Sequence, residues 1–304
     1  MKSAVILNAA AGPPAGRRDS SGADRVRAAF QRAGLKAIVT APERDSFVAA
    51  VRDAVASNAD IVVLGGGDGT LSAGALAMVG GAKPLGVLPL GTLNHFAKDL
   101  GIPLDLDAAV ETIRAGHVMD VDVGEVNGRV FLNNSSIGLY PIAVAEREEL
   151  RHRTGGGKGL AMLRASADVF TRFPLLEVTL PMEGRPTRLT TPFVFVGNNR
   201  YEMSLLALGT RSSLQGGELS VYIPRNGGRL GLLQLFFRGL LGRLDQERDF
   251  HSTAVPSIEI RTRRRSLRVS LDGEVAQITS PIRFLIRPRA LRVVAPPAKE
   301  GVEA

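Results

Sequence analysis

The chain has 304 residues, enough for two domains of ordinary size, and its 44% hydrophobic and 22% charged residues are typical of a globular protein with a substantial core. Lysine and arginine outnumber aspartate and glutamate by 38 to 30, and this excess favours an anionic partner such as a nucleotide, a nucleic acid or an anionic bilayer. The absence of cysteine excludes disulfides and thiolate zinc sites, and the four histidines have no metal-ligand spacing.

The two most apolar segments do not predict membrane crossing. The N-terminal run resembles a signal peptide only briefly, because Asn8 interrupts it and no clear cleavage site follows, so we predict a first strand there. Residues 230–242 contain Gln234 and Arg238 and are too short to span a bilayer. We expect a cytoplasmic protein that contacts a membrane peripherally.

The first 120 residues or so alternate short apolar runs with segments of helical periodicity, a pattern typical of βαβ units and a parallel sheet. We expect strands at residues 3–7, 35–40, 61–64 and 85–89. We expect helices at about 26–33, 48–55 and 71–79, from about 94, and at 106–115.

From about residue 120 the pattern changes to strand periodicity, with Gly, Pro and Asn between the strands, which predicts a β-sandwich. Asn127-Gly128, between two alternating runs, predicts a type I′ hairpin. Helical segments at about 142–173 and 230–250 interrupt the strands. The predicted fold is therefore a three-layer α/β domain with a parallel sheet (residues 1–123) and a β-sandwich (residues 124–286), with a disordered tail at 298–304.

The first candidate site is IVVLGGGDGT at residues 61–70, where a buried strand runs into three glycines and a helix. Such glycines let backbone N–H groups approach phosphate oxygens, and the helix N-terminus adds a positive dipole end. We expect Thr70 to cap the helix and Asp68 to act through Mg²⁺ or to orient a nucleotide. A tight strand-to-helix turn without a ligand explains this loop alone equally well, and the loop is neither a Walker A nor a Rossmann motif.

A second loop repeats the arrangement. A strand at residues 85–89 is followed by Gly91, Thr92 and, near the start of a helix, Asn94. Taken alone, this loop also fits an ordinary strand-to-helix turn. Two such loops at the carboxyl ends of two parallel strands, however, predict one phosphate-binding crevice.

These motifs together resemble the catalytic domain shared by diacylglycerol kinases, sphingosine kinases and bacterial lipid kinases. The GGDG element also occurs in NAD kinases and phosphofructokinases, so it indicates only the superfamily. The resemblance runs nearly end to end and rests on GGGDGT (65–70), P-x-G-T-x-N (89–94) and D-G-E (272–274), with NAAAG (8–12), NNSSIG (133–138) and GNNRY (197–201) as weaker matches.

The resemblance implies ATP and Mg²⁺ as cofactors. It implies that Asp272 is the general base and that Asp68 and Glu274 belong to a Mg²⁺ network, although Asp272-Gly273 taken alone favours a hairpin turn. The residues that it implies for the ATP phosphates are Gly65, Gly66, Gly67, Gly69 and Thr70, and those that line the nucleotide are Asn8, Gly91, Thr92 and Asn94.

One residue departs from the family pattern. His95 follows Asn94 where the family usually has aspartate, and histidine is a poor ligand for Mg²⁺. Asp99 is a candidate replacement acid. The departure bears on activity more than on fold, and it motivates one alternative, a non-catalytic nucleotide- or lipid-binding relative. A second alternative, a kinase for a soluble substrate of the NAD kinase type, stays open because that type shares the first glycine loop.

The leading hypothesis is the ATP-dependent phosphorylation of a lipid hydroxyl, diacylglycerol first, in a cleft between the two domains, with the lipid at the membrane surface as partner and no nucleic acid. A homodimer is left open, and the resemblance suggests that residues 287–297 return to the first domain. The apolar face within residues 230–244 favours packing on the sandwich over an interfacial helix. The basic run at 261–268 is a solvated face or a contact for anionic lipid heads or ATP.

Overall fold

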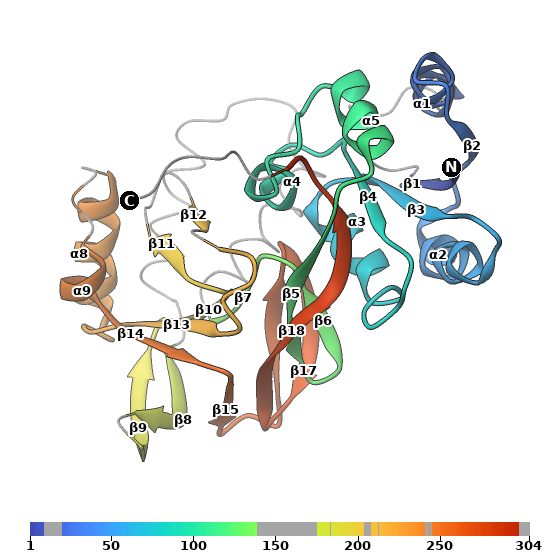
Figure 1. Ribbon diagram of the computed structural model, residues 1–304. Helices are drawn as coiled ribbons and strands as arrows, with labels where there is room; N and C mark the ends of the chain where they lie inside the picture. The colour runs from blue at the N-terminus through green and yellow to red at the C-terminus, as the bar shows by residue number, and fades with distance from the viewer. Residues whose placement is uncertain are drawn as a thin grey trace, which may run out of the picture. The chain divides into compact units, whose positions relative to one another are not determined.

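The computed structural model describes residues 1–8, 20–138, 175–182, 184–203, 208–211, 213–240, 243 and 245–297 (Figure 1). The chain divides into two compact units, unit 1 of Met1–Val123 with Arg287–Ala304 and unit 2 of Gly124–Ile286. Strands β5 (Val118–Val126) and β18 (Ile282–Val294) each contribute residues to both units. The helical segment expected at 142–173 and the tail expected at 298–304 lie outside the described residues.

Unit 1 is built on a parallel sheet in the order β2–β1–β3–β4, and the last part of β18 pairs with β4. The strands are β1 (Lys2–Leu7), β2 (Lys36–Thr40), β3 (Ile61–Gly66) and β4 (Leu85–Pro89). All residues of β3 and β4 are buried, which explains why these strands are continuous apolar runs without alternation.

Helices cover both faces of this sheet (Figure 1). Helix α1 contacts β2 and α5, whereas α2 contacts β1, β3 and α3. This is the arrangement that right-handed crossovers dictate when the chain changes direction across the sheet, and it confirms the predicted three-layer α/β fold. The helices are α1 (Ser20–Arg32), α2 (Phe47–Ala56), α3 (Asp68–Ala75), α4 (His95–Asp99) and α5 (Leu106–Ala115), with a 3₁₀ turn at Arg44–Ser46.

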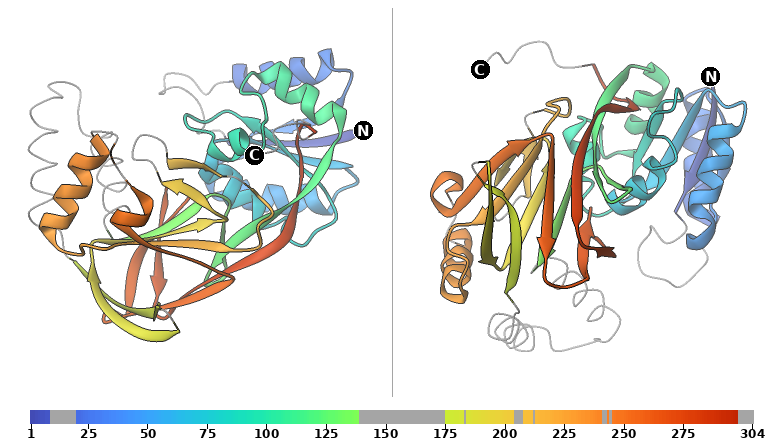
Figure 2. Two further views of the ribbon diagram at one scale, coloured as in Figure 1. Left: turned by 60° about the vertical axis from the view of Figure 1, so that its left-hand side comes forward. Right: turned by 90° about the horizontal axis from the view of Figure 1, so that it is seen from below.

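Unit 2 contains an antiparallel sheet in the order β14–β13–β10–β7–β16–β17 and a second set of strands in the order β18–β15–β8–β9, with β6 paired to β5 (Figure 2). Their bounds are β6 (Arg129–Phe131), β7 (Asn134–Gly138), β8 (Leu176–Met182), β9 (Arg185–Thr191), β10 (Phe193–Asn198), β13 (Leu219–Pro224), β14 (Phe250–Val255), β15 (Ser257–Thr262), β16 (Ser266–Leu271) and β17 (Glu274–Thr279). A short hairpin, β11 (Tyr201–Met203) with β12 (Leu208–Arg211), stands apart from both.

The core of unit 2 lies between these two sets of strands. Val178 of β8 and Ile260 of β15 belong to the same buried cluster as Val196 of β10 and Val269 of β16. In β8 and β15 the buried residues alternate with residues that face away from the core, as the period of two requires. The predicted β-sandwich is confirmed.

Two hairpins in unit 2 have the geometry that their sequences predict. Asn127 and Gly128 join β5 to β6 with φ angles of 44° and 82°, the left-handed values of a type I′ turn. Asp272 and Gly273 join β16 to β17 with φ angles of 47° and 86°. The hairpin interpretation of Asp272-Gly273 is therefore confirmed as local geometry.

The apolar segment at 230–250 forms two helices, α8 (Arg229–Leu240) and α9 (Gln246–Asp249), where the sequence analysis expected one. Leu232 and Leu235 are buried, and Leu235 packs in a cluster with Phe195 and Tyr222. For Leu235 packing on the sandwich is confirmed, whereas Leu230 is exposed. Within the described residues, every helix is too short or too polar to cross a bilayer.

Candidate active site

Three loops of unit 1 begin side by side at the carboxyl edge of the parallel sheet. The order β2–β1–β3–β4 means that the chain leaves β1 toward one edge and later returns to its other side, and ligands bind at such a switch point in open α/β sheets. Asn8 follows β1, and its N–H donates to the carbonyl of Gly65 at 3.0 Å. Leu90 follows β4, and its N–H donates to the carbonyl of Gly66 at 3.1 Å. The loops after β1, β3 and β4 are therefore held together at this edge.

Asp68 fastens the second glycine loop to the first. It is the first residue of α3, and its two carboxylate oxygens accept the backbone N–H groups of His95 at 3.1 Å and Phe96 at 3.0 Å. Because these N–H groups begin α4, they have no acceptor within that helix. Asp68 thus has an observed bracing role in addition to the predicted role in a Mg²⁺ network, which stays a prediction.

Asn94 shapes the second loop from inside. Its backbone is left-handed, with φ 50° and ψ 45°, and the residue is 4% exposed. Its Oδ1 accepts the N–H of Gly91 at 2.9 Å, and its Nδ2 donates to the carbonyls of Gly91 at 2.9 Å and Pro89 at 3.2 Å. The side-chain amide of Asn94 is thus hydrogen-bonded to its own loop. Thr92, which lies between Gly91 and Asn94 in the sequence, is exposed.

The glycines of the two loops differ in whether the surrounding structure has room for a Cβ atom. A Cβ on Gly91 would lie 2.4 Å from the Cα of Gly67, and a Cβ on Gly66 would lie 2.6 Å from the side chain of Thr70. A Cβ on Gly65 would lie 2.5 Å from a leucine side chain of β1. Packing within unit 1 therefore accounts for these three. A Cβ on Gly67 would meet nothing closer than 3.4 Å, so packing does not require glycine there.

Thr70 does not cap α3, and this prediction was wrong. The helix begins at Asp68, Gly67 is the N-cap, and the carbonyl of Gly67 accepts the N–H of Leu71 at 3.0 Å. Thr70 lies in the first turn, where it is buried and its Oγ1 accepts the Nδ2 of Asn8 at 2.8 Å. The contact links the loop after β1 to the start of α3.

The start of α3 suits a phosphate group. The first N–H groups of a helix have no acceptor inside it and carry the positive end of the helix dipole. Here they lie at the switch-point edge, next to Gly67, which presents no side chain to an approaching anion. Gly69 is in the same first turn. The described part of unit 1 thus provides the elements of an anion site.

The metal prediction has a weaker structural basis. Within the described residues, no group of three or more His, Cys, Asp or Glu side chains could hold a metal ion. Mg²⁺ in phosphoryl-transfer sites, however, often uses one or two carboxylates and completes its shell with phosphate oxygens and water. Asp68 fits such a partial donor set. His95, the departure from the family pattern, is half-buried and enters the observed contacts through its backbone N–H.

Asp272 and Glu274 belong to unit 2. The carboxylate of Asp272 accepts three backbone N–H groups, from Leu132 at 2.6 Å, Asn133 at 2.8 Å and Asn134 at 2.9 Å. These contacts hold the β16–β17 turn to the segment between β6 and β7. Glu274 begins β17 and is exposed. The structure thus gives Asp272 an anchoring role, and its role as general base stays a prediction, as does the metal role of Glu274.

The sequence analysis missed Arg211, a buried arginine beside this anchor. Its guanidinium donates to the carbonyl of Leu132 at 2.6 Å and to Oδ1 of Asn133 at 3.1 Å, and it lies 5.5 Å from the ring centre of Tyr201. Asn198 donates to the same Leu132 carbonyl at 2.8 Å. The two Asn-Asn segments were singled out as family matches, but a lone arginine in a short strand carries no sequence signal.

Comparisons with known proteins agree with this fold. A model of the diacylglycerol kinase catalytic domain matches residues 2–126. A protein of Pseudomonas aeruginosa described as "Probable lipid kinase YegS-like" is 33% identical over 260 residues, which cover 81% of this chain and 80% of that protein. One of the same description from Pseudomonas syringae pv. tomato is 32% identical over 81% of this chain and 79% of its own.

A solved structure has the same fold. The crystal structure of a diacylglycerol kinase from Bacillus anthracis str. Sterne superposes with a TM-score of 0.72 over 98% of both chains at 24% identity. The parallel α/β unit with its two glycine loops and the antiparallel sandwich are the two units of this shared fold. The chain belongs to the diacylglycerol kinase catalytic-domain family of lipid kinases, and the predicted resemblance is confirmed.

Proposed function

We propose that the protein transfers the γ-phosphoryl group of ATP to a lipid hydroxyl, with diacylglycerol as the leading acceptor. The observation that carries the proposal is the brace between the two glycine loops, in which Asp68 holds the start of α4 beside the start of α3. Family membership supports the same class of reaction, because the relatives are described as lipid kinases.

The residues of unit 1 have the roles of binding and positioning. The N–H groups at the start of α3 bind phosphate oxygens, and Gly67 lets them approach because it has no side chain. Asp68 and the substrate phosphates would hold Mg²⁺, which supplies charge neutralisation when bound. Asn8 and Asn94 keep the loops in shape through their bonds to Thr70 and Gly91.

The residues of unit 2 supply the predicted proton acceptor. A lipid alcohol must lose its proton as it attacks phosphorus, and a carboxylate is a suitable general base. Asp272 is the candidate, with its orientation fixed by three backbone donors. Proton transfer by such a group contributes about 10²–10⁴ in rate.

The test is a phosphotransfer assay with labelled ATP and Mg²⁺. Acceptors are diacylglycerol and a sphingoid base in neutral detergent micelles, with NAD in parallel. We expect label in diacylglycerol. Label in NAD without any lipid would instead support the soluble-substrate alternative. ATP binding without transfer to any acceptor would refute the proposed activity and support the non-catalytic alternative.

Asp272→Asn alone does not separate catalysis from folding, because the side chain also anchors a turn. Gly273→Ala is the matched control: it strains the same turn, whose φ is +86°, but keeps the carboxylate. We expect Asp272→Asn to lower kcat by about 10²-fold or more. Equal loss of activity in the two variants at equal melting temperature would contradict a base role.

A further inference from the structure

One surface of unit 2 is unusually rich in arginine and is not used by the site described above. It lies on β8, β9, β15, the first part of β18 and the turn that follows β15. We call it the arginine face, and its basic residues are Arg188, Arg261, Arg263 and Arg283, each of which pairs with a carboxylate of the face. Two more exposed arginines, Arg264 and Arg265, follow Arg263 in the turn. The side chains of those in ion pairs are 58–72% exposed.

Strand register places Arg188, Arg261 and Arg283 in rows on one side of the sheet. Arg261 of β15 pairs with Thr179 of β8, and Thr179 pairs with Arg188 of β9, so the three lie in one row across the strands. Glu259 of β15 pairs with Arg283 of β18 in a second row. The residues between them in sequence point into the core of unit 2, so the arginine face points away from that core.

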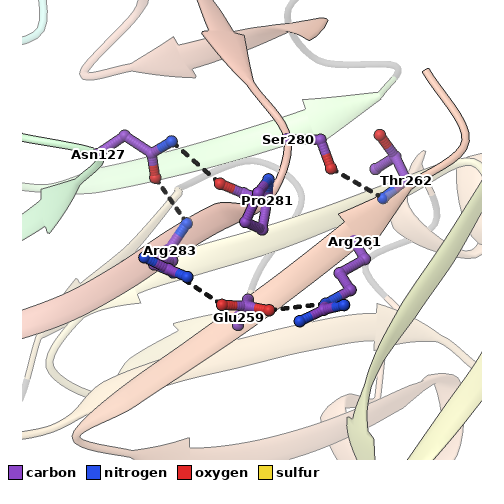
Figure 3. Close-up of polar contacts among 7 residues, drawn as sticks. All are labelled: Asn127, Glu259, Arg261, Thr262, Ser280, Pro281 and Arg283. Atoms are coloured by element: carbon purple, nitrogen blue, oxygen red, sulfur yellow. Dashed lines mark hydrogen bonds and ion pairs between the residues drawn. The ribbon is translucent and has the colours of Figure 1, made fainter. Parts of the chain in front are cut away.

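Each carboxylate of the arginine face lies between two arginines. Glu177 pairs with Arg188 and with Arg263, the latter at 2.9 Å. Glu259 pairs with Arg283 at 2.7 Å and with Arg261 at 2.8 Å, as Figure 3 shows. These two are the only acidic residues in the strands and the turn that define the face, against the four arginines that pair with them and two more, Arg264 and Arg265, in the turn. The face therefore keeps an excess of positive charge.

The backbone under this face is held in place. The side chain of Asn127 donates to the carbonyl of Pro281 at 3.1 Å and accepts the N–H of Arg283 at 2.7 Å (Figure 3). It also donates to the carbonyl of Thr279 at 3.0 Å. The hydroxyl of Ser280 accepts the N–H of Thr262 at 3.2 Å. The ion pairs also restrict the arginine side chains. Less conformational freedom is then lost when the guanidinium groups meet a partner.

We infer that the arginine face docks the protein on an anionic phospholipid bilayer. A guanidinium group binds phosphate through paired N–H donors, and a sheet face with several of them suits a surface of lipid phosphates. In the described strands of the face no aromatic side chain points outward, and nucleic-acid strands are usually held by stacking on such rings. The inference deepens the proposed function, on which it rests for its purpose: bringing the enzyme to a lipid substrate.

The experiment measures sedimentation of the full chain with phosphatidylcholine vesicles, with and without phosphatidylglycerol and without ATP. We expect binding only to the anionic vesicles, and a loss of binding as salt screens the charges. Each basic residue near an anionic surface strengthens binding about fivefold, so Arg188→Gln with Arg261→Gln should weaken it roughly 25-fold.

Two further double variants make the test specific. Glu177→Gln with Glu259→Gln removes the two negative charges from the face and should tighten binding. Arg25→Gln with Arg52→Gln removes two exposed positive charges from helices of unit 1 and should change it much less. Equal weakening by the two arginine doubles would mean that only net charge matters and would overturn the inference. Salt-sensitive binding to RNA with none to anionic vesicles would also overturn it.

A second readout separates this inference from the proposed function. Phosphotransfer to diacylglycerol in neutral detergent micelles needs no anionic surface, so Arg188→Gln with Arg261→Gln should leave it unchanged. Loss of vesicle binding with intact micellar activity supports the docking surface. Intact vesicle binding in that variant refutes the docking surface and leaves the kinase proposal standing. If the wild type transfers no phosphate but binds vesicles through the arginines, the kinase proposal is refuted and the docking surface is supported.

Discussion

Replacing Gly91 with alanine tests whether the two glycine loops of unit 1 require close backbone contact. The new Cβ would lie 2.4 Å from the Cα of Gly67 and 2.8 Å from Oδ1 of Asn94. An ordinary contact begins at 3.4 Å, so the two loops must separate by about 1 Å. Overpacking of this kind costs about 1–3 kcal/mol, which corresponds to a fall in Tm of roughly 2–5 °C for a chain of 304 residues. Thermal unfolding, followed by calorimetry, measures this directly.

Gly67→Ala is the matched control. Its φ of −89° is allowed for alanine and its Cβ would meet only the Cα of Gly91, at 3.4 Å. We expect Tm to stay close to that of the wild type while the affinity for ATP, measured by titration calorimetry, falls because the methyl group occupies the approach to the phosphate site. A wild-type Tm in Gly91→Ala would refute the packing argument. Unchanged ATP affinity in Gly67→Ala would refute the assignment of the phosphate site.

Two further predictions concern carboxylates. Asp68→Ala leaves the N–H groups of His95 and Phe96 without their acceptor, so unfolding should become easier by about 1–3 kcal/mol, with faster hydrogen exchange at these two amides. Hydrogen bonds from arginine lower the pKa of Glu177 and Glu259 below the ordinary value of 4.5. The stability that their ion pairs provide is therefore fully present above about pH 4.5 and is lost as the pH falls through the lowered values. The Tm difference between wild type and Glu177→Gln with Glu259→Gln should shrink below that pH.

Each of these two carboxylate predictions can be contradicted by a specific result. Unchanged exchange at the two α4 amides in Asp68→Ala would mean that the brace does not hold the second loop. A Tm difference between wild type and the glutamate double variant that does not change from neutral to acidic pH would mean that the arginine pairs do not contribute to stability.

Local sequence patterns predicted much of the fold because they express local physics. Residues 61–64 and 85–89 are apolar without interruption, as parallel strands buried on both faces must be. Asn127-Gly128 predicted its turn because both positions need a left-handed backbone. The prediction for Thr70 failed because threonine is a common N-cap, whereas the helix had already started at Asp68.

The sequence by itself determined the family and the two-part architecture and predicted the segments of the candidate site, because glycine spacing and strand periodicity are properties of neighbouring residues. Only the tertiary structure decided which partner each side chain has. Asp68 reaches amides that lie 27 and 28 residues away, and Asp272 reaches amides about 140 residues away. The tertiary structure also showed that the two aspartates act as anchors. The sequence motif alone does not indicate whether a carboxylate binds a ligand or accepts a backbone N–H group.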